Sequence, residues 1–117
     1  MRVTFSVAIL LAMTVVAFAQ LPEGPERTEA LKKRKELQEL IDLQLSQRKY
    51  GAAVASLEAA VELDKTIHGS AGKPVFFTLA ELAEQYFTLE EFGNESKTYA
   101  AMEPLAVKHF GEKHWRT

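Results

Sequence analysis

The stretch Leu37-Gln38-Glu39-Leu40, followed by Tyr50-Gly51, returns later in the chain as Leu79-Ala80-Glu81-Leu82 followed by Phe92-Gly93, at an offset of 42 positions. Two more pairs of identical residues keep the same offset: Leu63 and Leu105, Gly69 and Gly111. Within each unit the apolar residues recur at the spacing of an amphipathic helix. Repeats of this length, which cannot bury their apolar faces alone, are typical of helical solenoids. The sequence therefore predicts an all-α protein of two tandem antiparallel helical hairpins, a short α-solenoid.

Proline and glycine divide the chain into elements. The segment 20–28 is expected to be a linker, because it holds two prolines and a glycine. Residues 29–117 then contain the two repeats, about 34–74 and 75–114. The boundaries of the predicted helices are as follows: about Glu26 to near Gln47, Tyr50 to just before Gly69, Pro74 onward, and Phe92 onward, with the turns inside the hairpins centred near Gly51 and Gly93. Pro104 lies within the fourth helix, where a kink or an early stop is expected.

The first 19 residues are predicted to be a secretory signal peptide that is not part of the fold. Arg2 precedes an almost uninterrupted apolar run, and Ala17-Phe18-Ala19 fits the small-residue cleavage pattern. Cleavage would leave a secreted chain, periplasmic in a bacterium, that begins at Gln20. The alternative is an uncleaved N-terminal membrane anchor, because the 17 uncharged residues from Val3 to Ala19 approach the length of about 17–25 that spans a bilayer.

Composition narrows the remaining choices. The chain of 117 residues is 47% hydrophobic, has a formal net charge of −2 and contains no cysteine. This length suits one domain. A charge so close to zero predicts no attraction to nucleic acid or to an anionic membrane. The absence of cysteine excludes a disulfide framework, a zinc ribbon and thiol catalysis, so stability must come from packing.

No motif predicts an enzyme, a cofactor or a metal site. The loop Gly69-Ser70-Ala71-Gly72-Lys73 differs from a phosphate-binding loop, because Ile67 stands where the first glycine is needed and Pro74 follows the lysine. The three histidines lie near predicted helix ends, where the helix dipole favours them, and not at a ligand spacing: His68, His109 and His114. The glutamates alternate with lysines as on solvated helix faces.

Two surface signals keep alternatives open. The run from Lys32 to Lys35 fits an exposed helix that pairs with Glu29 and Glu36, and its alternative is a patch for phosphate or anionic lipid. The segment Asn94-Glu95-Ser96 fits the glycosylation acceptor pattern, which matters only in a host that glycosylates exported chains.

The apolar positions also resemble a known family. In the second unit the order of residues is Leu79, Leu82-Ala83, Tyr86, Phe92, Tyr99, and the matching first-unit positions are Leu37, Leu40-Ile41, Tyr50, Ala53, Leu57 and Ala60. This order resembles the tetratricopeptide repeat, and the long period with Gly111-Glu112-Lys113-His114 resembles repeats of the kinesin light chain type. The resemblance covers about residues 34–114. Three positions depart from it: Ile41, Gln44 and Glu95. The segment from Tyr99 to Leu105 offers a competing register, and an unrelated four-helix bundle is the structural alternative.

The resemblance implies a non-enzymatic protein-protein interaction module whose first helices line a concave binding surface. Helical angles place eight residues beside the core stripe of these two helices, on the flank that would face a peptide or protein segment: Lys35, Gln38, Asp42, Leu45, Phe77, Ala80, Glu84 and Phe87. The alternative is that Phe77 and Phe87 are covered by the N-terminal segment or by a second copy.

Two further expectations concern partners. Two repeats are fewer than the three or so that usually make a solenoid stable, so self-association is expected at the open C-terminal end, through Val107, Phe110 and Trp115. The alternative function is a small helical carrier that encloses an apolar ligand between its helices.

Overall fold

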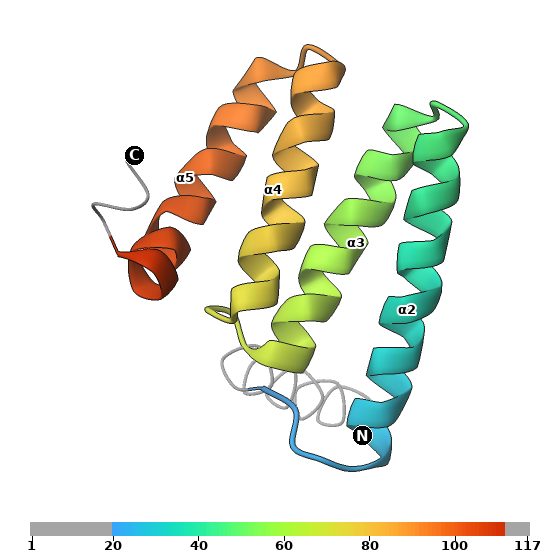
Figure 1. Ribbon diagram of the computed structural model, residues 1–117, viewed down its shortest axis with the longest axis vertical. Coiled ribbons are helices and arrows are strands. Elements are labelled where there is room, and N and C mark those ends of the chain that lie inside the picture. Colours follow the sequence, from blue (N-terminus) through green and yellow to red (C-terminus); the bar gives the residue numbers. More distant parts are fainter. Residues whose placement is uncertain (1–19, 112–117) are drawn as a thin grey trace, which may run out of the picture.

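The computed structural model describes residues 20–111. The predicted signal peptide, His114 and Trp115 lie outside the described residues. Within them the chain forms four helices, α2 (Pro25–Ser46), α3 (Tyr50–His68), α4 (Lys73–Thr88) and α5 (Phe92–Phe110). Figure 1 shows them standing in a row in chain order, as two antiparallel hairpins, one after the other. The prediction of an all-α fold built from tandem hairpins is confirmed.

The helices pack only on their neighbours in the chain. Helix α3 packs on α2 and on α4, and α5 packs on α4, whereas α2 and α5 lie at opposite edges of the row (Figure 1). A closed four-helix bundle would bring the first and last helices together. Among the helices of residues 20–111, the open row therefore gives the two inner helices neighbours on both sides and leaves each outer helix with one.

The offset of 42 positions is present in the backbone. Helices α3 and α5 begin 42 residues apart, at Tyr50 and Phe92, and the glycines that follow them have nearly the same φ, 86° for Gly69 and 82° for Gly111. These positive φ values are costly for any residue with a Cβ atom, which explains why glycine stands at both helix ends. The predicted helix ends near Gln47 and before Gly69 are confirmed.

The turns inside the hairpins do not lie where the glycines predicted them. Gly51 and Gly93 are the second residues of α3 and α5, and a Cβ atom at either would meet nothing within 4 Å. The left-handed residues are Arg48, with φ 58°, and Glu90, with φ 59°. The expectation of turns centred near the glycines is therefore wrong.

Each of these turns is a Schellman motif, in which backbone N–H groups beyond the helix bond to its last carbonyls. The N–H of Lys49 donates to the Gln44 carbonyl at 2.8 Å, and Glu91 donates to Tyr86 at the same distance. The left-handed residue of this motif is usually glycine. Because an arginine and a glutamate occupy it here, composition gave no sign of the turn.

Helix α5 continues through Pro104 to Phe110, so it does not stop early. In Figure 1 its last turns, in red, are seen more nearly end on than the rest of the helix. A bend at this point fits the loss of one backbone donor and the crowding that a proline ring causes in a helix interior.

One apolar core runs through the row. Its largest fully buried side chains come from three helices: Ile41 from α2, Leu57 from α3 and Val75 from α4. Leu79, Leu82, Tyr86, Met102 and Leu105 continue it into the second hairpin. Burial of each such side chain contributes about 1.5–3 kcal/mol to folding.

The segment expected as a linker is partly structured. Helix α2 begins at Pro25, and Leu21 is buried with Ala30 and Ile67 in a small second cluster. The Leu21 N–H donates to the Ile67 carbonyl at 3.1 Å, and the Arg27 guanidinium donates to the carbonyls of both residues. The residues before α2 are therefore held against the end of α3.

Candidate functional site

A groove of about 300 Å³ lies between α2 and α4, over α3. Seven residues line it, and we call it the α2/α4 groove: Arg34 and Gln38 from α2, Asp64 from α3, and Pro74, Phe77, Thr78 and Glu81 from α4. Because the first helix of each hairpin forms one wall, this is the flank on which the sequence predicted a partner surface.

The floor of the groove is a buried polar network. The Asp64 carboxylate accepts from Arg34 Nε at 2.9 Å and from the Thr78 hydroxyl. The Arg34 Nη2 group also donates to Thr78 Oγ1 at 3.4 Å. Asp64 is almost fully buried, and its pairing with a guanidinium and a hydroxyl satisfies a charge that would otherwise be costly inside the protein. This network links α2, α3 and α4 across both hairpins.

The α2 wall extends the network along the helix. Arg34 Nη1 donates to Gln38 Oε1 at 3.0 Å, and Gln38 Nε2 donates to Asp42 Oδ1 at 2.9 Å. These contacts join residues four apart on one helix face, as the helical period requires. They fix the orientation of both polar side chains toward α4.

The groove has an excess of negative charge. Partial burial raises the pKa of the Glu81 carboxyl, Arg34 lowers it, and the carboxylates of Asp42, Glu84 and Asp64 raise it further. Arg34, the one cation that lines the groove, is already paired with Asp64. The acidic side chains at the rim therefore lack a matching positive charge within the groove.

An aromatic group completes the groove at the start of α4. Phe77 is 52% exposed. Its ring packs edge-on against Phe76, at 5.5 Å between centroids, and against Phe110 at 6.1 Å. Because these neighbours hold the ring, it presents a fixed apolar surface beside the carboxylates.

The structure separates the eight predicted site residues into three groups. Gln38 and Phe77 line the groove, and Asp42 adjoins it through its bond to Gln38. Lys35, Glu84 and Phe87 are exposed outside it. Leu45 and Ala80 are half-buried against the main core, so they contribute mainly to stability.

Sequence reasoning missed five groove residues: Arg34, Asp64, Pro74, Thr78 and Glu81. One signal was present for Asp64, because it continues the apolar stripe of Leu57 and Val61 at a spacing of three. An acidic residue on a core stripe predicts a cationic partner nearby, because an unpaired carboxylate is costly to bury. The charged run from Lys32 to Lys35 predicts that Arg34 is exposed. In the structure Arg34 instead points inward to Asp64, while its lysine neighbours are exposed.

The described N-terminal segment does not cover the exposed phenylalanines. Leu21 lies against Ala30 and Ile67, whereas Phe87 pairs with Phe92 at 6.1 Å between ring centroids at the turn of the second hairpin. The residues proposed for self-association also differ from one another. Phe110 is half-buried against Phe76, at 5.2 Å between centroids, whereas Val107 is exposed and Trp115 lies outside the described residues.

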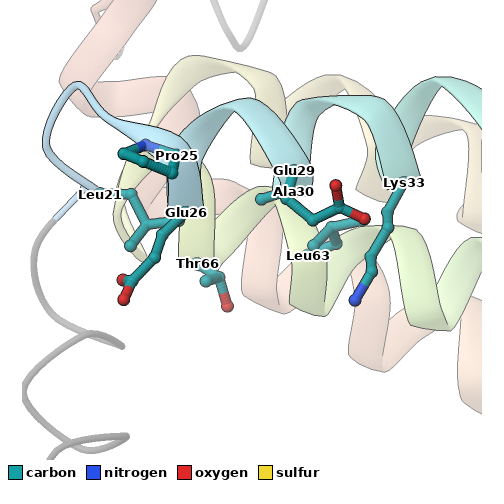
Figure 2. A pocket seen from close by; sticks show the side chains of 8 residues that line it. All are labelled: Leu21, Pro25, Glu26, Glu29, Ala30, Lys33, Leu63 and Thr66. Carbon is teal, nitrogen blue, oxygen red and sulfur yellow. The ribbon is translucent and has the colours of Figure 1, made fainter.

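A second hollow, of about 500 Å³, lies where α2 begins and α3 ends. Figure 2 shows Leu21, Pro25 and Glu26 at one end of this hollow and Lys33 at the other, with Leu63 and Thr66 contributed by α3. Its walls are mostly apolar, and it is open to the surface. We call it the N-terminal hollow.

Within residues 20–111, no three His, Asp or Glu side chains converge in a way that could hold a metal ion. None of the helices in this part of the chain is long and apolar enough to cross a membrane. No protein-family model, curated protein or solved structure gives a significant match to this chain.

Proposed function

We propose that this protein is an exported, non-enzymatic interaction module of tetratricopeptide-like design, which binds a protein or peptide segment in the α2/α4 groove. The observation that carries the proposal is the combination of a fixed floor, the Arg34–Asp64–Thr78 network, with an exposed aromatic ring and unmatched carboxylates above it. A preorganised surface of this kind lowers the entropic cost of binding.

The chemistry of the groove selects the segment. Glu81 and Asp42 favour a lysine or arginine, and Phe77 favours an apolar side chain beside it. An extended segment fits a groove bounded by two helices better than a globular surface does. We therefore expect binding to weaken as salt concentration rises.

Affinity capture from an extracytoplasmic fraction tests the proposal, with the wild-type chain compared with Phe77→Ala and Glu81→Gln. Each variant should lose roughly fivefold or more in affinity, because losing a contact at the centre of an interface typically costs more than about 1 kcal/mol. Tyr99→Ala is the matched control, since Tyr99 is an equally exposed aromatic on α5, away from the groove. A captured protein retained equally by all four chains would contradict the groove as the binding site.

A carrier of an apolar ligand is the second candidate, and the apolar walls of the N-terminal hollow are the observation in its favour. Mass spectrometry of the purified protein under native conditions would show a bound small molecule if the chain is a carrier. If the protein purifies without a bound small molecule and still captures a protein through Phe77, the carrier is excluded and the interaction module is supported.

A further inference from the structure

Helix α4 shows which face of a first helix becomes buried inside the row. The Thr78 hydroxyl donates to Asp64 of α3, so the helix face that carries Thr78 points toward α3. Three other residues share this face, because they lie three, four or seven positions from Thr78: Val75, Leu82 and Gln85. All of them are buried there. In helix α2 the equivalent positions, 42 residues earlier, are all exposed: Lys33, Glu36, Leu40 and Leu43. We call these four the α2 edge face.

The α2 edge face has two unlike ends. At one end Leu40 and Leu43 are 44% and 53% exposed, whereas Leu82 and Gln85 in α4 are 5% and 8% exposed. At the other end lies the N-terminal hollow, which shares Lys33 with the face (Figure 2). One end therefore offers protruding leucines and the other an apolar depression.

A second copy that extended the row head to tail would not complement this face. Its α5 would take the place that α3 takes on α4, where Val54, Leu57 and Val61 supply the apolar contact. The equivalents in α5 are all exposed and bear polar groups: Ser96, Tyr99 and Glu103. Glu103 would lie against leucine without a cation, which is unfavourable.

The α2 edge face does complement the same face of a second copy when the two α2 helices run antiparallel. The hollow is centred near Glu29 and Ala30, and the two leucines lie roughly 19 Å farther along α2, at 1.5 Å per residue. A twofold axis midway between them passes between Lys35 and Glu36. Two antiparallel copies of α2 about that axis place the leucines of each over the hollow of the other.

The charges agree with the same register. Lys32 of each copy then faces Glu39 of the other. Lys33 lies about 3 Å along the helix from the position opposite Glu36, within reach of its long side chain. These pairs occur on both sides of the axis. All four side chains are exposed and available for such pairing. The interface would have opposite charges at its centre, and at each end the two leucines of one copy would cover the apolar hollow of the other. This pattern is typical of an isologous interface.

We infer that the α2 edge face binds a second copy of this chain, as an antiparallel α2–α2 dimer with Leu40 and Leu43 of each copy in the N-terminal hollow of the other. The dimer does not depend on the α2/α4 groove, which lies on a different flank of α2. Each copy thus keeps a groove for a partner segment.

Sedimentation of the purified protein over a range of concentrations tests the inference. The wild-type mass should rise toward that of two chains, and the double variant Leu40→Glu/Leu43→Glu should remain at one. Leu31→Glu is the matched control, because Leu31 is a 43% exposed leucine of the same helix that points about 120–180° away from the other two. It should dimerise as the wild type does. A wild-type chain that is monomeric at millimolar concentration, a double variant that still dimerises, or a control that fails equally would overturn the inference.

Charge reversal tests the register, with circular dichroism to confirm that each variant is folded. Lys33→Glu and Glu36→Lys each place like charges at the centre, so each should dimerise at least about tenfold more weakly, a loss of about 1.4 kcal/mol. Mixing the two single variants restores opposite charges on both sides of the axis and should restore the dimer as a heterodimer. If the mixture stays monomeric while the wild type dimerises, this register is wrong.

Discussion

Helices α2 and α4 hold equivalent places in the two hairpins, but among the helices of residues 20–111 α4 lies between α3 and α5, whereas α2 has a neighbour on one side only (Figure 1). The same helix position is consequently buried in one hairpin and exposed in the other. Leu82 is buried against its neighbours, and Leu40 is half exposed to solvent. A side chain's environment here depends on where its hairpin stands in the row as much as on its place in the repeat.

The comparison also explains a departure from the repeat pattern. The hydroxyl of Tyr86, in α4, donates to Glu58 of the preceding hairpin at 2.7 Å, and burial together with this bond raises the pKa of Tyr86 to about 12. Gln44, the equivalent residue in α2, has no helix on that side within residues 20–111 and instead accepts a hydrogen bond from Ser56 of its own hairpin at 2.8 Å. An aromatic residue is useful only where a helix stands on that side.

The largest expected effect comes from breaking the link between the hairpins. Asp64→Ala leaves the Arg34 guanidinium without its partner and removes the acceptor of the Thr78 hydroxyl, so urea unfolding should show a loss of about 3–5 kcal/mol in the free energy of unfolding. The equivalent α5 residue is the buried Ala106, which bridges nothing.

A double variant separates the pair from the surrounding packing. Arg34→Met/Asp64→Leu replaces both charges by apolar groups and should recover most of the stability lost in Asp64→Ala. If Asp64→Ala unfolds at the same urea concentration as the wild type, the network does not hold the hairpins together.

The next largest effect sets the two hairpins directly against each other. Leu82→Ala should lower the free energy of unfolding by about 2–4 kcal/mol, because it leaves a cavity in the packed core. Leu40→Ala should lower it by less than about 1 kcal/mol, because Leu40 is half exposed. Urea unfolding of the two variants in the Leu43→Glu background keeps any second copy away from α2. Equal losses would show that the hairpins do not differ in burial as described.

A smaller effect should be the same in both hairpins, because their turns are the same. Glycine in place of the left-handed Arg48 or Glu90 keeps the turn and removes the steric cost of this conformation, which is about 1–2 kcal/mol for a residue with a Cβ atom. The gain is partly offset by the flexibility that glycine adds to the unfolded chain. Thermal unfolding should show each variant to be more stable by about 0.5–1 kcal/mol. A loss of stability in either would argue against the left-handed turn there.

The smallest effect is a pH dependence confined to the junction of the hairpins. Burial lowers the pKa of His68, Asp64 raises it, and the arginines Arg27 and Arg34 lower it. The unfolded chain therefore holds this proton more tightly than the folded one, and stability should fall as the pH drops below about 6.5. In His68→Gln this part of the pH dependence of the melting temperature should disappear. A stability that rises as the pH falls through that window would contradict the direction of the shift.

The sequence predicted the parts of the fold that depend on local signals. Tyr50 and Phe92 mark true helix starts, and Gly69 closes α3 as a glycine with positive φ should. The hairpin turns were misplaced because Arg48 and Glu90 adopt a conformation that their residue types do not favour, while Gly51 and Gly93 have no special geometry. Backbone conformation at such positions follows from the hydrogen bonds of the whole turn and not from composition.

The candidate site was predicted only in part, for a related reason. The helical angle was enough to place Gln38 and Phe77 on the flank that carries the groove. The pairing of Arg34 with Asp64 joins residues on different helices, 30 positions apart, and no periodicity within one helix can reveal it. Periodicity within one helix also does not reveal the α2 edge face. That face is recognised only from α4, where the equivalent residues are buried against neighbouring helices.

Among the helices of residues 20–111, α2 is an uncovered edge of the row and α4 is a covered inner helix. Amide hydrogen exchange in the Leu43→Glu variant measures this directly, because exchange by local opening is faster where fewer neighbours hold a helix. We predict that the amides near Leu40 exchange by local opening well before those near Leu82, which should approach the protection of the whole fold. Equal protection at these two equivalent sites, or slower exchange near Leu40, would contradict it.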